Sequence, residues 1–316
     1  MQVLIAIIFG IVEGITEWLP VSSTAHLILL NEWLHFDLTP EKEEAFMELF
    51  NVVIQLGAIM AFVIIDWKNL WPFGLAGKQS GSDHKTSSSK TAGRKKKGEE
   101  GPRWKFGPIA VKQNSIFLWI KIAIACIPGF AYGVLLDDVV EEYTDKYETT
   151  IIGIMLILVG LIFILVERHI KVKEKKPKVK LLTELTWQTA LIIGLAQVIA
   201  AALPGTSRSG ATIIAGLLLG LSRPVAVRFT FDLAVPTMAG ASLLKLLKFI
   251  KNGLVLSSGE LTILIVSSVT AFLVSFVAIS MMIIYISKNK DFKPFGIYRI
   301  ILGAVVLLYF LVIAGV

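Results

Sequence analysis

The chain has 316 residues, of which 55% are hydrophobic and 17% charged, and its mean hydropathy is +0.72. This composition excludes an ordinary soluble domain, and the continuous rather than alternating apolar runs exclude a membrane β-barrel. The formal net charge of +7 is concentrated in a few polar stretches between apolar runs, so it does not indicate nucleic-acid binding.

The first predicted element, residues 1–35, is an apolar segment with a polar break that reads EGITEWLPVSSTAH. Its apolar flanks predict a helix–break–helix that enters and leaves the membrane on one side. Glu13 and Glu17 are four residues apart, so their carboxylates project from one helical face. Two carboxylates at membrane depth repel each other unless a cation or a shared proton lies between them. The break also supplies the polar side chains of Ser22, Ser23, Thr24 and His26.

Three membrane spans are predicted after this segment, at residues 50–66, 114–136 and 149–166. The positive-inside rule assigns three basic stretches to the cytoplasmic side, at residues 77–105, 167–180 and 287–293. The first of these stretches is rich in glycine, serine and lysine, which predicts a flexible loop. The acidic stretches 36–48 and 137–148 are assigned to the outer side.

A second broken segment, residues 185–222, contains the polar stretch LPGTSRSGAT. Pro204 and Gly205 end one predicted helix, and a new helix begins near 207–209. The free N–H groups at its start, together with Arg208 and the neighbouring hydroxyls, are typical of an anion site that suits phosphate. Three further spans are predicted at residues 226–249, 260–286 and 295–316.

The two broken segments resemble each other after a shift of 184 positions. This shift aligns Gly10 with Gly194, Glu13 with Gln197, Leu19-Pro20 with Leu203-Pro204, and Ser23 with Ser207. Each segment precedes three spans, and the two sets of spans start on opposite sides. We therefore predict a single all-α polytopic membrane domain over residues 1–316, built from inverted repeats at about 1–166 and 185–316. Chance similarity between two apolar segments is the alternative.

The stretches EGITEWLPVSSTAH and LPGTSRSGAT resemble the two signature motifs of the bacterial undecaprenyl-diphosphate phosphatases, also called bacitracin-resistance proteins. FNVVIQLGAI at 50–59 and FTFDLAVP at 229–236 fit the same family, and the resemblance covers essentially the whole chain. Trp18 and Ala25 stand where the family commonly has Phe and Gly, and Asp232 stands where relatives often have an apolar residue. Asp232 lies four residues after Arg228, so an ion pair within one helix would account for it.

The resemblance implies hydrolysis of undecaprenyl diphosphate to the monophosphate and inorganic phosphate, which recycles the lipid carrier for cell-wall synthesis and confers bacitracin resistance. It implies a multi-pass protein of the bacterial inner membrane whose active site faces outward. It also implies two inverted repeats, each a re-entrant helix pair followed by three transmembrane helices, and activity supported by a divalent cation, Mg²⁺ or Ca²⁺. The partners expected are the polyprenyl diphosphate and membrane lipid, and both a monomer and a homodimer stay open.

Brought together, the two breaks would form a phosphate cradle opposite two carboxylates, a histidine and hydroxyls. Ser23 is the candidate nucleophile. His26, three residues later and so on the same helical face, is the group that activates it or protonates the leaving oxygen, although His26 itself could be the nucleophile. Arg208 is expected to bind the diphosphate oxygens, with a structural ion pair to Glu13 or Glu17 as the alternative. Glu13 and Glu17 would hold the metal ion. The remaining expected contacts to substrate are Ser22, Thr24, Gln55, Ser207, Ser209 and Thr212, and a buried interhelical hydrogen bond is the alternative for Gln55.

Other classes of protein fit the residues less well. A zinc hydrolase needs more histidine or cysteine ligands at metal spacing than this chain has. The other large superfamily of membrane lipid phosphatases uses a histidine after its Ser-Arg motif, whereas all four histidines here precede Arg208. A polyprenyl-phosphate flippase or transporter is the serious alternative, because inverted repeats with broken helices are transporter architecture. It gives no reason for Ser23 and His26 together.

Overall fold

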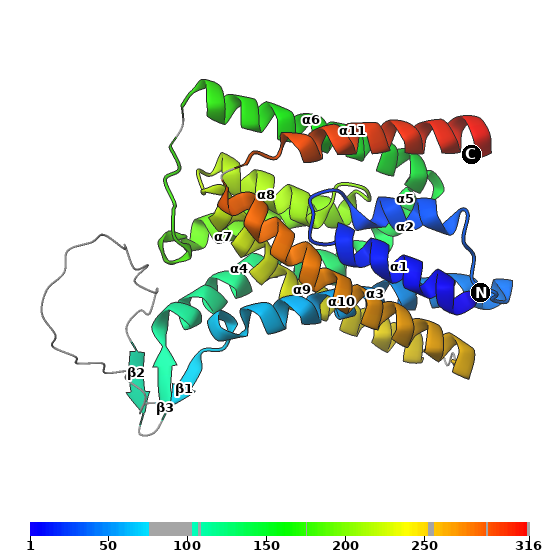
Figure 1. Ribbon diagram of the computed structural model, residues 1–316, viewed down its shortest axis with the longest axis horizontal. Coiled ribbons are helices and arrows are strands. Elements are labelled where there is room, and N and C mark those ends of the chain that lie inside the picture. The colour runs from blue at the N-terminus through cyan, green and yellow to red at the C-terminus, as the bar shows by residue number, and fades with distance from the viewer. Residues whose placement is uncertain (76–102, 107–108, 175, 252–255, 289, 315–316) are drawn as a thin grey trace, which may run out of the picture.

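The structure is a computed structural model that describes residues 1–75, 103–106, 109–174, 176–251, 256–288 and 290–314 (Figure 1). Its α-helices are α1 (Gln2–Thr16), α2 (Ser23–Asn31), α3 (Pro40–Leu70), α4 (Gln113–Leu135), α5 (Asp137–Thr144), α6 (Glu148–Val172), α7 (Trp187–Ala202), α8 (Arg208–Leu218), α9 (Arg223–Lys251), α10 (Ser258–Ser287) and α11 (Lys293–Leu308). Short turns η1 (Asp145–Tyr147) and η2 (Leu182–Glu184) and the π-helix η3 (Tyr309–Ala314) complete the helical part.

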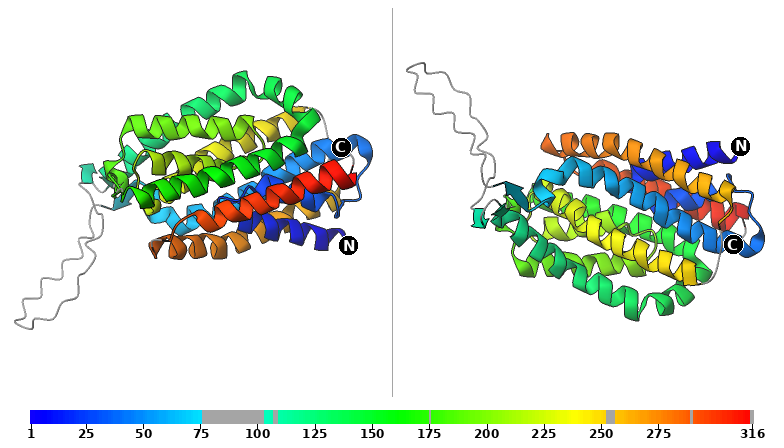
Figure 2. Two further views of the ribbon diagram at one scale, coloured as in Figure 1. Left: turned by 90° about the horizontal axis from the view of Figure 1, so that it is seen from above. Right: turned by 90° about the horizontal axis from the view of Figure 1, so that it is seen from below.

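Among the described residues, six helices are long and apolar enough to cross a membrane, namely α3, α4, α6, α9, α10 and α11 with the start of η3. Each coincides with one predicted span, so the prediction of a polytopic helical membrane protein is confirmed. The helices run roughly along one common axis, as the views from above and below show (Figure 2). Exposed tryptophans and tyrosines lie near the helix ends, where membrane proteins place their aromatic belts; they include Trp33, Trp67, Trp71, Tyr143 and Tyr147.

A small sheet at one end of the helical bundle was not predicted. Strands β1 (Phe73–Leu75), β2 (Arg103–Phe106) and β3 (Ile109–Lys112) form an antiparallel sheet in the order β1-β3-β2. The end of the predicted loop 77–105 therefore belongs to a strand, and its residues 77–102 lie outside the described part of the chain. Apolar and basic residues alternate in β2, which is the period of a strand.

The first spanning helix begins earlier than the predicted span 50–66. Helix α3 already begins at Pro40, so most of the acidic stretch 36–48 forms the first turns of this helix. Proline suits the first turn of a helix, and glutamates there interact favourably with the positive end of the helix dipole. The second acidic stretch, 137–148, holds α5 and η1.

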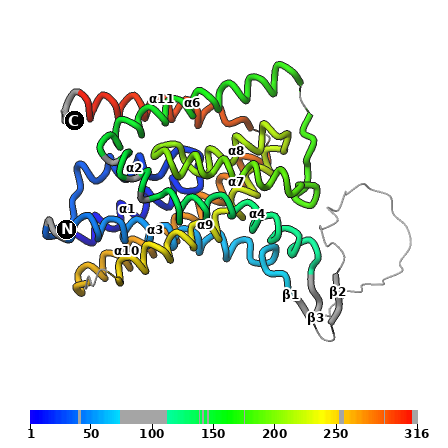
Figure 3. The backbone as a smooth tube through the Cα atoms, turned by 180° about the vertical axis from the view of Figure 1, so that it is seen from behind, coloured from blue at the N-terminus to red at the C-terminus, as the bar shows by residue number. Residues whose placement is uncertain are grey.

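Two pairs of shorter helices do not cross the bundle. Helices α1 and α2 enter from the end where both termini lie, and the chain returns to that end after the break between them (Figure 1). Helices α7 and α8 enter from the opposite end, which also carries the small sheet, and α7 runs beside α4 (Figure 3). Both breaks therefore lie inside the bundle, at the inner ends of half-length helices, as the sequence predicted.

Glycines let the half-length helices pack directly on the backbone of spanning helices. A Cβ added to Gly10 of α1 would lie 2.5 Å from the carbonyl oxygen of Ser267 in α10. A Cβ added to Gly194 of α7 would lie 2.3 Å from the carbonyl oxygen of Ala125 in α4. Small residues at helix contacts are the usual means of close packing in membranes. These contacts fix α1 and α7, and hence both breaks, against the spanning helices.

Candidate functional site

Each break ends in a serine that has an unusual backbone conformation. Ser22 has φ 73° and ψ 97°, and Ser207 has φ 67° and ψ 117°. These two residues are the N-caps of α2 and α8, so each turns the chain directly into a new helix. The Ser207 hydroxyl accepts a hydrogen bond from the Gly210 N–H at 3.2 Å, whereas the Ser22 side chain makes no such cap bond. The start of the second helix near residues 207–209 is thus confirmed.

Glu17 joins the two breaks. Its Oε2 accepts a hydrogen bond from the Ser23 hydroxyl at 2.9 Å, and its Oε1 accepts one from Arg208 Nη2 at 2.9 Å. A second link runs from the Ser209 hydroxyl to the Leu19 carbonyl oxygen at 3.4 Å. Residues that are about 190 positions apart in the sequence therefore form one cluster. The cluster contains an acidic group, a hydroxyl and a guanidinium.

Glu13 lies one helical turn before Glu17 and is fully buried. Neither of its carboxylate oxygens has a hydrogen-bond partner among the described residues. A buried carboxylate without a partner carries a large desolvation cost, which a bound cation or a proton would relieve. The described part of the chain holds no group of three or more His, Cys, Asp or Glu side chains with metal-ligand geometry. Two carboxylates do fit Mg²⁺, which commonly takes one or two carboxylates and completes its shell with phosphate oxygens and water.

His26 is half-buried and is held on both sides of its ring. Its Nδ1–H donates to the Ser22 carbonyl oxygen at 2.7 Å, because a carbonyl can only accept. The other ring nitrogen, Nε2, then accepts from the Tyr298 hydroxyl of α11 at 2.6 Å, and the two rings are stacked. The sequence predicted that His26 activates Ser23 or protonates the leaving oxygen; in the structure the Ser23 hydroxyl donates to Glu17. Tyr298 was missed because nothing in its local sequence marks it.

The other predicted contact residues differ in how they are placed. Ser207 and Ser209 have their hydroxyls 3.1 Å apart at the start of α8, beside Arg208. Thr212 already donates to the Arg208 carbonyl oxygen at 2.9 Å and accepts from Thr230, so the protein itself uses its hydroxyl. Thr24 is exposed in the first turn of α2, and Gln55 is half-buried on α3.

A residue outside both motifs also contacts both breaks. Arg299 of α11 is fully buried and donates to the carbonyl oxygens of Pro20 at 3.3 Å, Gly205 at 2.8 Å and Thr206 at 2.9 Å. Its one local signal in the sequence is its place, as an arginine within the final apolar span. A charge at that depth is usually functional, but its partner could not be read from a sequence position some 280 residues away from Pro20.

With this geometry established, comparison with known proteins identifies the family. A family model described as bacitracin resistance protein BacA matches residues 6–305. The chain belongs to this family. Similar proteins called undecaprenyl-diphosphatase include those of Desulfitobacterium hafniense, 47% identical over 98% of this chain and 96% of the relative, and Enterococcus faecalis, 44% identical over 97% and 96%. Undecaprenyl-diphosphatase 1 of Clostridium acetobutylicum is 45% identical over 99% of both chains.

This BacA-family chain has a second buried charged group, between α3 and α9. Arg228 forms an ion pair with Asp66 of α3 and approaches Asp232, four residues further along α9, with Nε 3.5 Å from Oδ1. The predicted ion pair within one helix is therefore present. This contact is an ion pair without a hydrogen bond, and both oxygens of the buried Asp232 lack a hydrogen-bond partner among the described residues. Within the described part of the chain, no hydrogen bond or ion pair joins this group to Ser23 or Arg208.

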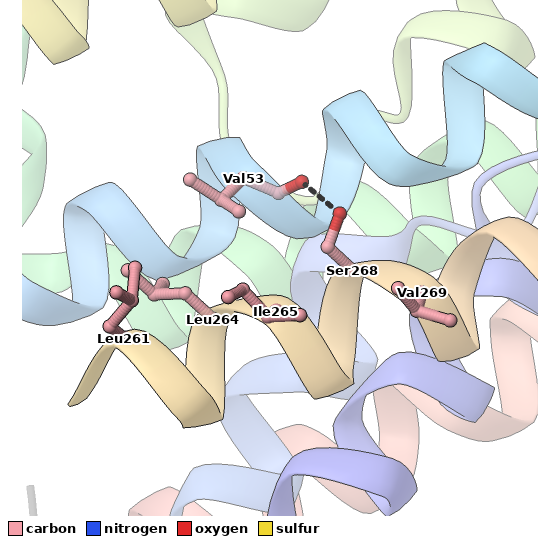
Figure 4. Close-up of a pocket in the computed structure, with 6 residues that line it drawn as sticks. All are labelled: Val53, Leu261, Leu264, Ile265, Ser268 and Val269. Atoms are coloured by element: carbon pink, nitrogen blue, oxygen red, sulfur yellow. Dashed lines mark hydrogen bonds between the residues drawn. The ribbon is translucent and has the colours of Figure 1, made fainter. Parts of the chain in front are cut away.

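An apolar hollow of about 300 Å³ lies between α3 and α10 (Figure 4). It is lined by Val53, Leu261, Leu264, Ile265, Ser268 and Val269. Its one polar side chain, Ser268, is already bonded to the Val53 carbonyl oxygen at 3.2 Å. The hollow shares no residue with the polar cluster of this BacA-family chain, so the chemistry belongs to the breaks.

Proposed function

We infer that this chain is an undecaprenyl-diphosphatase, which hydrolyses undecaprenyl diphosphate to undecaprenyl phosphate and inorganic phosphate. The observation that carries this inference is the cluster around Glu17, which joins a serine hydroxyl to an arginine beside a helix start. Full-length relatives at about 45% identity carry the same activity in their names. The product would re-enter cell-wall synthesis as a lipid carrier, and the family name connects this activity with bacitracin resistance.

The hydrogen bond between Ser23 and Glu17 favours Ser23 as the nucleophile. In this mechanism the Ser23 oxygen attacks the terminal phosphorus and its proton passes to Glu17. The bond from that phosphorus to the bridging oxygen breaks, and undecaprenyl phosphate leaves. Water then cleaves the phosphoserine and releases inorganic phosphate. His26 is less suited to direct attack, because Tyr298 donates a hydrogen bond to its Nε2.

Arg208 is suited to bind the phosphate that reacts. Its guanidinium forms a planar fork that matches phosphate oxygens, and it already lies beside the carboxylate that would take the Ser23 proton. The N–H groups at the start of α8 and the hydroxyls of Ser207 and Ser209 would bind further oxygens. When phosphate replaces Glu17 as a partner of Arg208, the Glu17 Oε1 is freed while Oε2 still faces the Ser23 hydroxyl.

Glu13 and Glu17 are the residues that would hold a divalent cation, Mg²⁺ or Ca²⁺. The support is the unpartnered, fully buried carboxylate of Glu13. When bound, the cation would neutralise part of the negative charge of the diphosphate. Without it, Glu13 must be kept neutral by a proton or bear the cost of an unpaired buried charge.

The fold supports inverted repeats around this site. Helix α1 packs on α10, the second span of the other half, and α7 packs on α4, the corresponding span of the first half. The third spans, α6 and α11, pack on each other, as related elements near a two-fold axis would. Basic residues at the ends of α6 and α10 assign the sheet end to the cytoplasm. The α1–α2 pair then enters from outside, which favours an outward-facing site in the bacterial inner membrane.

A test of catalysis separates this function from a pure flippase, which the opposed half-length helices would also suit. Purified protein in detergent, with Mg²⁺ and a polyprenyl diphosphate, should release inorganic phosphate without any gradient. Ser23→Ala provides the matched control, since it removes only the hydroxyl that donates to Glu17. Binding of the lipid without phosphate release by the unmodified protein would support the transporter instead.

A further inference from the structure

Arg299 is placed where it can control both breaks at once. It lies on α11, whose neighbouring residues Tyr298 and Ile301 are about half exposed, yet its own side chain is fully buried. The guanidinium donates to the carbonyl oxygen of Pro20 in the first break and to those of Gly205 and Thr206 in the second. One rigid, planar guanidinium group thus contacts the backbone of both breaks.

The carbonyl contacts also determine where neighbouring N–H groups point. A peptide unit is planar and trans, so its N–H points away from its carbonyl oxygen. Because Arg299 holds the Thr206 carbonyl oxygen at 2.9 Å, the N–H of Ser207 points away from Arg299. Ser207 is the N-cap of α8 and its hydroxyl lies beside that of Ser209. The orientation of the second break, including its donors, therefore depends on Arg299.

The charge of Arg299 has no anionic partner within the described part of the chain. Its recorded partners are carbonyl oxygens, and its Nε has no hydrogen-bond partner. Arg208, by contrast, is paired with Glu17. A buried guanidinium without a carboxylate adds a positive potential that low-dielectric surroundings screen poorly. Because Arg299 contacts Pro20 in the first break and Gly205 and Thr206 in the second, this potential acts on both breaks.

We propose that Arg299 is a positioning residue of the phosphate site, which holds the two breaks in register and adds a second positive charge to that of Arg208. It contacts backbone rather than substrate, so it acts through the loops. The proposal rests on the proposed phosphatase function. It predicts that shape and charge contribute separately, because lysine keeps the charge but cannot reach three carbonyl oxygens in a fork.

Two variants separate these contributions. Arg299→Lys should lower kcat roughly 10-fold while leaving KM and inhibition by inorganic phosphate within about 3-fold of the unmodified protein, since hydrogen bonds to charged groups are lost but the charge remains. Arg299→Gln should lower kcat by roughly 100-fold and weaken phosphate inhibition by roughly 10-fold, because the positive potential is also lost.

Arg223→Lys is the matched control, because Arg223 forms a buried ion pair with Glu167 away from the breaks. It should lower the melting temperature but keep kcat within about 2-fold of the unmodified protein. A kcat loss in Arg223→Lys that equals the loss in Arg299→Lys would overturn the proposal, since both would then be stability effects.

The proposal would also be overturned if the Arg299→Lys and Arg299→Gln variants fold and have the same kcat and KM as the unmodified protein. If Arg299→Gln does not accumulate in the membrane, Arg299→Lys is the deciding variant. A normal kcat in Arg299→Lys would show that Arg299 is not needed to hold the two breaks in register. Absence of phosphate release from the unmodified protein, measured in the same assay, would instead contradict the phosphatase function itself.

Discussion

The two breaks share one backbone feature but carry different side chains. Each ends in a serine with positive φ, Ser22 or Ser207, that turns the chain into a half-length helix. The first break carries carboxylates, a serine hydroxyl bonded to one of them, and a histidine. The second carries an arginine and hydroxyls at a helix start. In the mechanism proposed above, the first break would perform the reaction and the second would bind the phosphate.

The division is also visible in how each break uses its serine. The Ser207 hydroxyl caps its own helix, so its position is fixed by local structure. The Ser23 hydroxyl follows the N-cap and donates across the break to Glu17 instead. Because the Ser23 hydroxyl does not cap a helix, it could react with substrate without loss of a capping hydrogen bond. If the two breaks are specialised in this way, substitutions in the first should lower kcat, and substitutions around the second should also change binding.

The largest effect is expected in the first break. Ser23→Ala and Glu17→Gln should each lower kcat by roughly 10³-fold, because each removes one member of a nucleophile–base pair. The double variant should be no worse than either single variant, since residues that act as a unit are not additive. Steady-state phosphate release measures this. Independent, multiplicative losses would mean that the pair does not act together.

A slightly smaller loss is expected for Arg208→Lys in the second break. Lysine keeps the charge but loses the planar fork, so kcat/KM should fall by roughly 10²-fold with KM clearly raised. Size-exclusion chromatography and thermal melting should show an intact fold. Near-normal turnover would make Arg208 a structural partner of Glu17 and remove the distinction between the breaks.

An intermediate effect should come from α11. Tyr298→Phe removes the hydroxyl that donates to His26 Nε2, so the ring loses one of its two restraints. We expect kcat to fall about 5-fold with KM unchanged, as the loss of one hydrogen bond would cause. Tyr309→Phe is the matched control, because Tyr309 contacts Trp33 through its ring. Equal effects of both changes would argue against a role for Tyr298 in holding His26.

The smallest effect concerns the approach of the substrate. Lys245, Lys248 and Lys251 are spaced three apart at the end of α9, which lies at the entrance end of the first break. Replacing all three with glutamine should raise KM about 3-fold at low salt and leave kcat unchanged, because screening weakens such steering. Lys288→Gln at the opposite end should change neither parameter. Unchanged kinetics in the triple variant would leave these lysines only a role at lipid headgroups.

The spanning helices and both breaks could be predicted because their signals are local. An apolar run of bilayer length, or a Pro-Gly break within one, needs no knowledge of distant residues. The start of α3 was missed because acidic residues before an apolar run look like a loop, although they suit the first turns of a helix. The small sheet was missed because its strands border a basic, low-complexity stretch.

The contacts of the site could be predicted only in part. The contact between the two breaks could be predicted because their side chains are complementary. One break carries a base, and the other carries an anion site. The spacing of Ser23 and His26 predicted one helical face, but the His26 ring turns to the Ser22 carbonyl oxygen and to Tyr298. Tyr298 and Arg299 act over more than 270 residues of sequence, where no local pattern could identify them.

The backbone of Ser22 bears on how this protein could be made more robust. Positive φ is unfavourable for any residue with a Cβ, by about 1–2 kcal/mol, and glycine avoids that penalty. Ser207 recovers part of it through its cap bond, but the Ser22 side chain makes no cap bond. Ser22→Gly should therefore raise thermal tolerance, whereas Ser207→Gly should not. A stabilised form for biophysical work would begin with the first of these substitutions, and any activity it loses would measure what the Ser22 hydroxyl contributes.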